Sequence, residues 1–359
     1  MARIEPAVWH RRDPRTLVEA LAALPDDDTR GMRFIGIDRS ESYDFFADLR
    51  VEAQRCARKW MRLGFAKGSP VALIVDDNRD FVRAFLGAVI AGLVPVPIHP
   101  RPRFKRLAAY CDAVAQIVEA ACTRAVITNQ RQLPIIERLL GRKLRDGGAV
   151  ECVMAVEDLM ALDEESNCVL PTVSPDDICF LQFTSSSQST PKSVSVTHAN
   201  IVAHAKAAWG SAPGLERNDS DVAISWLPLF HDMGLIGFVL GPIVCNVSSV
   251  LLPTEAFARR PAVWLETISR CRGTITFAPN FAYAMATKHV RDDELQGIDL
   301  STLRIAGCGS EPINPDVMRA FADRFAAVGF RAEALTPTYG LADIEWTLDG
   351  LSGMRVGSH

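Results

Sequence analysis

Short apolar segments alternate with segments of helical spacing along most of this chain, and the alternation restricts the possible folds more than any other feature. In the first half, apolar runs typical of buried strands stand at 70–75, 94–98, 125–128 and 153–156. Apolar residues at helical spacing mark 16–24, 43–63, 79–91, 103–121 and 133–140. Strands and helices that alternate in this way form parallel sheets with helices on both faces.

The second half repeats the pattern after a polar, acidic stretch with two prolines at 162–177, which we interpret as a linker. Strands are predicted from residue 178 and at 222–226, 247–252, 274–278, 303–306 and 332–335, and helices from residue 197 and at 260–271, 280–289 and 315–328. The sequence therefore predicts an α/β fold of two doubly wound lobes with mostly parallel sheets, formed by residues 1–170 and 171–359. In such sheets ligands bind at the carboxyl ends of the strands.

The composition excludes several classes of protein. A chain of 359 residues that is 48% hydrophobic and 23% charged can build a large globular core. Its net charge of −4, without a basic or aromatic stripe, argues against a nucleic-acid partner. The nine cysteines form no CxxC pair, so we expect reduced thiols. No apolar run follows the charged first residues, and we expect a cytoplasmic protein.

One uncharged run, residues 233–252, is long enough on paper to cross a bilayer. Gly234, Gly237, Gly241 and Pro242 interrupt it, which favours a short helix followed by the strand at 247–252. We therefore expect no membrane span.

The stretch that points to chemistry runs from residue 178 to residue 200. An apolar strand leads into a loop of small or polar residues, and a helix capped by Thr197 or Asn200 is predicted after it. Backbone N–H groups and the positive end of a helix bind anions, so we interpret the loop as a phosphate site to which Lys192 adds a charge. The glycines of a Walker A motif are absent, and a Ser/Thr surface loop without function stays open as the alternative. The loop consists of Thr184, Ser185, Ser186, Ser187, Gln188, Ser189 and Thr190.

This loop, with the residues up to Val194, resembles the TSGSTGxPKGV signature of adenylate-forming enzymes, the superfamily of acyl-CoA synthetases, luciferases and peptide-synthetase adenylation domains. Ser186, Ser189 and Ser193 stand where that family has glycines. Four later segments resemble further blocks of the family in the same order: LPLFHDMGL at 227–235, APNFAY at 278–283, AGCGSEP at 306–312 and PTYGLAD at 337–343. The HDMGL and PNFAY forms are similar to those of fatty acyl-AMP ligases, so the chain is identified as a relative of the large N-terminal domain of that subgroup.

The resemblance implies that a fatty acid is activated with ATP and Mg²⁺ to acyl-AMP, with release of pyrophosphate. It implies catalytic roles for Lys192, His231 and Asp343, with Asp343 also the magnesium ligand. Besides the phosphate loop, the implied nucleotide contacts are Gly309, Ser310, Glu311, Pro312, Thr338, Tyr339 and Gly340, with Tyr339 stacked on adenine. The implied lining of the acyl pocket is Phe230, Met233, Gly234, Asn280, Phe281 and Tyr283.

Three interpretations of the function stay open at this point. The chain is the large domain of an acyl-adenylating ligase, a fragment of an acyl-CoA ligase, or a degenerate nucleotide or lipid binder. The third follows from the serines of the loop, because a serine forced to positive φ is strained and narrows the approach of a phosphate. The acceptor is open between coenzyme A and an acyl carrier protein. The family's later ribose-binding block and C-terminal domain do not occur before His359, so we expect weak activity from this chain alone.

Overall fold

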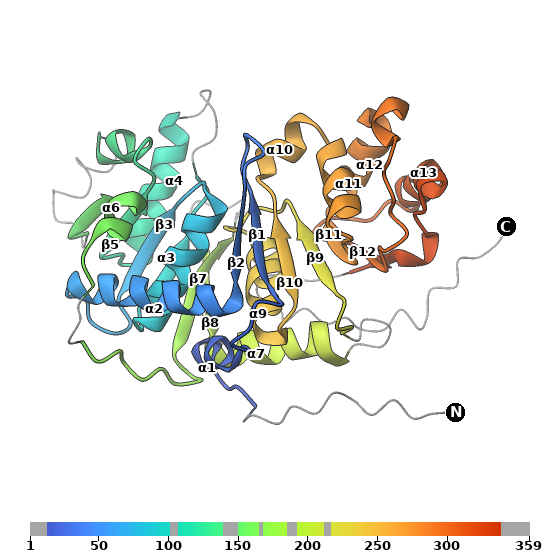
Figure 1. The fold of residues 1–359 in the computed structure, drawn as a ribbon. Helices are drawn as coiled ribbons and strands as arrows, with labels where there is room; N and C mark the ends of the chain where they lie inside the picture. Colours follow the sequence, from blue (N-terminus) through green and yellow to red (C-terminus); the bar gives the residue numbers. More distant parts are fainter. Residues whose placement is uncertain are drawn as a thin grey trace.

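A computed structural model describes residues 13–100, 107–138, 150–164, 168–184, 192–211 and 217–338. Their strands form three sheets, of four, seven and two strands. Figure 1 shows the four-stranded and the seven-stranded sheet on opposite sides of the molecule, with the two-stranded sheet between them. The predicted α/β fold with mostly parallel sheets is confirmed.

The four-stranded sheet has the order β4-β3-β5-β6, and all its neighbouring strands are parallel. Helix α2 packs against helix α3 with an amphipathic face on which Leu49, Ala53 and Trp60 are fully buried. Helix α3 begins where the carboxylate of Asp77 accepts the N–H groups of Arg79 and Asp80. The elements of this lobe are α2 (Phe46–Arg62), β3 (Pro70–Ile74), α3 (Asn78–Ile90), β4 (Val94–Pro97), α4 (Leu107–Ala120), β5 (Ala125–Thr128), a helix at 133–138, β6 (Cys152–Ala155) and α6 (Val156–Ala161).

The seven-stranded sheet has the order β13-β12-β11-β9-β10-β1-β2. Every pair of neighbours is parallel except β1 and β2, which form an antiparallel edge. Its strands are β1 (Gly31–Ile35), β2 (Glu41–Phe45), β9 (Val222–Ser225), β10 (Ser248–Leu251), β11 (Ile275–Ala278), β12 (Ile305–Cys308) and β13 (Leu335–Pro337). The other elements around it are α1 (Leu17–Ala23), α7 (His198–Lys206), η1 (Ala207–Ser211), α8 (Asp232–Leu235), η2 (Ile236–Leu240), α9 (Gly241–Cys245), α10 (Thr254–Arg259), α11 (Ala262–Arg270), α12 (Asn280–His289), η3 (Asp292–Leu295), α13 (Pro315–Phe325), η4 (Ala326–Val328) and η5 (Ala332–Ala334).

Strands β1 and β2 were missed by the sequence prediction, which began a helix at residue 43. Residues 41–45 are the second strand of a hairpin, and α2 begins only at Phe46. Met32 pairs with Ser249 of β10, so strands from the first 45 residues complete the sheet of the second half. The sheets therefore do not divide at residue 170, and a domain boundary at that residue stays a prediction.

The two large sheets share one hydrophobic core. It contains Trp60 and Phe85 from the four-stranded lobe together with Phe238 and Trp264 from the seven-stranded one. A smaller cluster around Val96 and Val118 packs against the other face of the four-stranded sheet. A continuous core of this kind fixes the two lobes, and the residues on their facing edges, relative to each other.

The remaining sheet is an antiparallel hairpin of β7 (Ile178–Thr184) and β8 (Lys192–Thr197), and β7 packs beside β4. Strand β8 was not predicted. After it, Thr197 caps α7: its hydroxyl accepts the N–H of Asn200, whose side chain accepts the N–H of Thr197 in return. Both residues proposed for the cap therefore take part in it.

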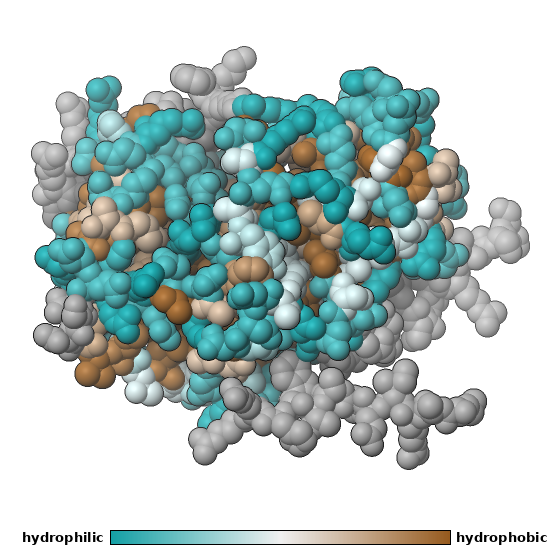
Figure 2. Space-filling model, in the orientation of Figure 1, coloured by the Kyte–Doolittle hydropathy of each residue, from teal (hydrophilic) through white to brown (hydrophobic). Residues whose placement is uncertain are grey.

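Hydrophilic side chains cover most of the face seen in Figure 2, where hydrophobic ones form small separated groups. Among the described residues, no helix has the length and apolar character needed to cross a membrane, and 233–252 forms α8, η2, α9 and β10 instead. All nine cysteines are free thiols, as expected. A cytoplasmic location stays a prediction.

Candidate active site

The predicted phosphate loop is the turn of the β7–β8 hairpin. Thr184 pairs with Lys192 at the end next to the loop, and the residues between them, 185–191, lie outside the described part of the chain. Helix α7 begins only after β8, at the opposite end of the hairpin. Six strand residues span about 20 Å, so the positive end of this helix is too far away to serve the loop. The predicted order of strand, loop and helix was wrong, because strand β8 intervenes. Lys192 itself is exposed.

Ser193 does not need the backbone of a glycine. It lies in β8 and pairs with Phe183, and it is not among the described residues with positive φ. The argument that serine at this position strains the loop is therefore wrong. Ser186 and Ser189 lie outside the described part of the chain, so the proposal that these two serines need a glycine-like backbone stays a prediction.

The turn after β9 leads directly into α8 and carries His231. Gly234 permits this tight path, because a Cβ there would lie 2.2 Å from the carbonyl oxygen of Pro228. The side-chain amide of Gln182, on β7, donates to the carbonyl oxygen of Phe230 at 2.9 Å. This hydrogen bond fastens the hairpin, and with it the start of the phosphate loop, to the His231 turn.

His231 and Asp232 form a hydrogen-bonded pair at the start of α8, with 2.6 Å between Nδ1 and Oδ1. The hydrogen bond to Asp232 raises the pKa of His231 above its usual value, against the effect of burial. Burial alone would raise the pKa of Asp232, but the hydrogen bond and charge of His231 hold it below its usual value. The N–H of Met233 lies 2.7 Å from Oδ1 of Asp232 and 3.3 Å from Nδ1 of His231. An ionised carboxylate can only accept, so the proton of the His231–Asp232 hydrogen bond is on Nδ1, the Met233 N–H donates to Asp232, and Nε2 is the nitrogen left for other chemistry.

Helix α12 has the predicted bounds, Asn280–His289, and Pro279 is the residue before it. Asn280 was expected in the lining of the acyl pocket. The amide of Asn280 is buried; its oxygen accepts the N–H of Asn314 at 3.3 Å and its nitrogen lies 3.4 Å from the sulfur of Met318. Asn280 therefore connects the starts of α12 and α13.

Tyr283 was expected in the acyl pocket but lies in the core on the other face of the sheet. Its ring packs edge-on against Trp264 at 5.5 Å, and its hydroxyl donates to the carbonyl oxygen of Gly307 at 2.8 Å. The indole of Trp264 in turn donates to Thr276. Side chains alternate along a strand, so Thr276 faces away from its neighbours Ile275 and Phe277, which line the cavity described below. Tyr283 is therefore a core residue that does not line this cavity.

The turn after β12, Gly309 to Pro312, contacts three of the other predicted segments. Ser310, held at φ 65°, donates its hydroxyl to the sulfur of Met233 at 3.4 Å. Glu311 accepts the N–H of Phe281 at 2.6 Å, and a Cβ on Gly309 would lie 2.5 Å from the hydroxyl of Thr338. Left-handed backbone at a non-glycine residue is strained and is frequent in functional sites. Four segments that are distant in the sequence thus meet at the carboxyl edge of the seven-stranded sheet.

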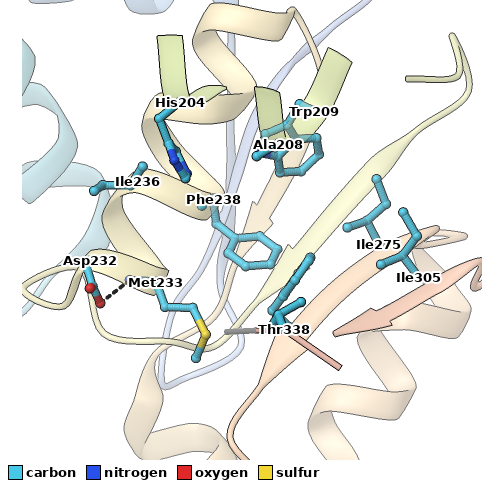
Figure 3. Close-up of a pocket in the computed structure, with 12 residues that line it drawn as sticks. His204, Ala208, Trp209, Asp232, Met233, Ile236, Phe238, Ile275, Ile305 and Thr338 are labelled. Carbon is cyan, nitrogen blue, oxygen red and sulfur yellow. Dashed lines mark hydrogen bonds between the residues drawn. The ribbon is translucent and has the colours of Figure 1, made fainter. Parts of the chain in front are cut away.

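An apolar cavity of about 60 Å³ opens beside this meeting point (Figure 3). Asp232, Met233 and Thr338 belong to it as well as to the predicted segments. Figure 3 shows Asp232, Met233 and Thr338 on one side of the cavity and Ala208 and Trp209 on the opposite side. The rest of the lining lies outside the residues named from the motifs, and consists of His204, Ala208, Trp209, Ile236, Gly237, Phe238, Ile275, Phe277 and Ile305.

Phe230 faces a separate, larger cleft of about 1440 Å³ between the two lobes. Its ring lies 4.4 Å from that of His99, whose pKa is lowered by burial. Phe281 is about half exposed and borders the aromatic cluster of Trp226. Of the six residues proposed for the acyl pocket, Met233 is the one in the lining of the apolar cavity.

The remaining predicted residues, Ser185 to Thr190, Tyr339, Gly340 and Asp343, lie outside the described part of the chain. Within the described ranges, no group of three or more His, Cys, Asp or Glu side chains is placed to hold a metal ion. The magnesium role of Asp343 therefore stays a prediction.

Comparison with known proteins identifies a family model that covers most of the chain. Residues 34–345 match the model described as AMP-binding enzyme. A protein of Caulobacter vibrioides provisionally named an acyl-CoA synthetase is 38% identical over 299 residues, which is 83% of this chain and 50% of that protein. A medium-chain-fatty-acid–[acyl-carrier-protein] ligase of Moorena producens is 32% identical over 276 residues, 76% of this chain and 45% of the ligase.

Solved structures give the same result. A structure from a study of fatty acyl-adenylate ligases of E. coli and L. pneumophila superposes with a TM-score of 0.85 at 33% identity, covering 92% of this chain and 58% of that one. The chain spans about half the length of the curated relatives it matches.

Proposed function

This chain belongs to the AMP-binding enzyme family, and we propose on that basis that it is the nucleotide- and acid-binding part of a ligase that joins a fatty acid to AMP. The carboxylate oxygen of the acid forms a bond to the α-phosphorus of ATP, the bond from that phosphorus to the bridging oxygen breaks, and pyrophosphate leaves with the electron pair. Catalysis of this kind depends mainly on positioning and on neutralising charge. Magnesium would supply part of that neutralisation at the phosphates.

One observation carries the proposal: the apolar cavity and the polar turns share residues. Asp232, Met233 and Thr338 line the cavity, while the same segments contact the Gly309–Pro312 turn and, through Phe230, the β7–β8 hairpin. An acid whose hydrocarbon chain occupied the cavity would place its carboxylate among these turns. Ligand sites of doubly wound proteins form at such carboxyl edges.

The residues around the carboxylate end have distinct proposed tasks. Asp232 holds His231 in the tautomer that leaves Nε2 toward the reactants. Thr338 is fixed by its own backbone and hydroxyl, which both donate to the carbonyl oxygen of Cys308, at 2.7 and 3.0 Å. Lys192 at the loop is proposed to meet the phosphates. Tyr339 and Asp343 keep their predicted roles, as adenine platform and magnesium ligand.

The test is acid-dependent exchange of labelled pyrophosphate into ATP, run with a panel of fatty acids on this chain and on any longer form of the protein. Exchange that requires a fatty acid supports the proposal, and silence from both forms with every acid contradicts it. Nucleotide binding without exchange in the longer form would instead favour a degenerate binding domain.

A matched pair of variants tests the site. Thr338→Val removes the hydroxyl but keeps the β-branched shape, and it should lower the exchange rate by about tenfold or more, the effect of roughly 1.4 kcal/mol on the barrier. Thr336→Val makes the same change two residues earlier, where the hydroxyl donates to the carbonyl oxygen of Ala334, and should stay within about twofold. Equal rates for the two variants would remove Thr338 from the site.

For the acceptor of the acyl group we propose an acyl carrier protein, since one relative is named for that acceptor. Transfer from the adenylate to a carrier protein, compared with transfer to coenzyme A, decides between the two.

A further inference from the structure

Three glycines follow one another in the helical segment beside the cavity, and two of them are required by packing. A Cβ on Gly234 would lie 2.2 Å from the carbonyl oxygen of Pro228. A Cβ on Gly241 would lie 2.6 Å from the indole nitrogen of Trp209. Neither position has room for a side chain.

Gly237 is different. A Cβ built on it meets no atom within 4 Å, and its φ is not in the left-handed region that favours glycine. It lies in η2, a short π-helix, and glycine is the least favourable residue in a helix apart from proline. Neither packing nor backbone conformation in the described part of the chain explains a glycine at this position.

Its place in the cavity does provide an explanation. Gly237 belongs to the lining, between Ile236 and Phe238, which also line it. The sheet side of the cavity is closed by the branched and aromatic side chains of Ile275, Phe277 and Ile305. The cavity is narrow, at about 60 Å³, so a single added side chain would take a substantial part of its space.

We propose that Gly237 is a specificity-determining residue: its missing side chain keeps the cavity open for the hydrocarbon chain of the acid and so sets the longest acid that this protein accepts. This inference rests on the proposed function for the identity of the ligand, an unbranched alkyl carboxylate. A glycine inside a helix opposes helix propensity, and residues that oppose local propensity in this way are expected at functional sites.

The test measures binding rather than turnover, so that it does not depend on catalysis. A fluorescent fatty acid bound to the 359-residue chain is displaced by the even-numbered alkyl carboxylates from butanoate to hexadecanoate, for wild type, Gly237→Ala and Gly237→Leu. A buried methylene changes affinity by roughly fourfold. Gly237→Leu should therefore weaken the longest acids that bind wild type by about tenfold or more, leave the shortest within about twofold, and Gly237→Ala should fall between.

Two controls separate this effect from damage to the fold. Both Gly237 variants should melt at or above the temperature of wild type, because alanine and leucine are better helix formers and the position has open space. Val51→Leu enlarges an exposed side chain on α2, in the other lobe, and should leave the chain-length profile unchanged.

The outcomes are decisive in either direction. An unchanged profile in Gly237→Leu, or an equal loss at all chain lengths, would overturn the inference, as would a wild-type chain that binds no alkyl carboxylate. A shifted profile combined with no adenylate from any form of the protein would sustain the role of Gly237 and refute the proposed ligase activity.

Discussion

Acid should destabilise this protein through His198, the first residue of α7. Its side chain is 2% exposed, and its Nδ1 accepts the N–H of Leu17, the first residue of α1, at 3.2 Å. A protonated Nδ1 cannot accept this bond. Burial lowers the pKa of His198 to about 4, and the charge of Asp177 only partly opposes this effect.

The sign of the change in the free energy of unfolding with pH follows from the number of protons that His198 binds in the folded and in the unfolded chain. Between pH 6.5, the ordinary pKa of histidine, and about pH 4, the unfolded chain binds the proton and the folded chain does not. The contribution of His198 to the free energy of unfolding is therefore fully present above pH 6.5 and is lost as the pH drops toward 4. The gap between the two pKa values corresponds to about 3 kcal/mol in all, of which about 2 kcal/mol is lost between pH 7 and pH 5.

Urea denaturation followed by circular dichroism at a series of pH values measures this loss. His198→Asn is the control, because the asparagine oxygen occupies the place of Nδ1 and does not titrate. Carboxylates contribute equally to both proteins, so the difference between the two curves isolates the histidine. Wild type should lose about 2 kcal/mol more than the variant between pH 7 and pH 5. Curves that run parallel would refute the reasoning.

Three further changes test the site itself. Gly234→Ala forces a methyl group against the carbonyl oxygen of Pro228 and should lower the free energy of unfolding by about 1–3 kcal/mol in a urea titration; a variant as stable as wild type would show that the turn can move. Glu311→Gln removes a negative charge from the start of α12 and should cost about 0.3–1 kcal/mol, with weaker nucleotide binding by calorimetry; unchanged values in both would separate this residue from the site. Asp232→Asn should lower the pKa of His231 in an NMR titration, since the hydrogen bond to Asp232 raises it, and a pKa that stays in place would assign the shift to another group.

The sequence predicted the parallel strands best where they are continuous apolar runs buried on both faces. Strand 94–98, for example, became β4, in which every residue is buried. It failed at β2, whose polar residues 41–44 carry no apolar run and are held by pairing with β1. The sequence prediction also missed β8. Its alternating serines are typical of a loop, and the strand forms because these residues pair with β7.

The site was predicted in its segments but not in its geometry. Thr338, Gly309 and His231 were named from local motifs, and the structure brings their segments together. Trp209 and Phe277 were missed because they come together only in the folded sheet. Which face of β11 meets η1 and η2 depends on the order of the strands, and local motifs carry no information about that order. The alternation of side chains along a strand was a signal only that Ile275 and Phe277 share one face of β11.

The pairing of β1 with β10 also has a consequence for biosynthesis. Met32 leaves the ribosome 217 residues before its partner Ser249, and at about 5–20 residues per second that interval is roughly 10–40 s. During this time the β1–β2 hairpin presents one unpaired edge, with Met32 and Phe34 still without the core that buries them in the finished protein. Single-residue changes in this hairpin are therefore expected to alter the yield of folded protein made in cells more than the stability of the protein once it has folded.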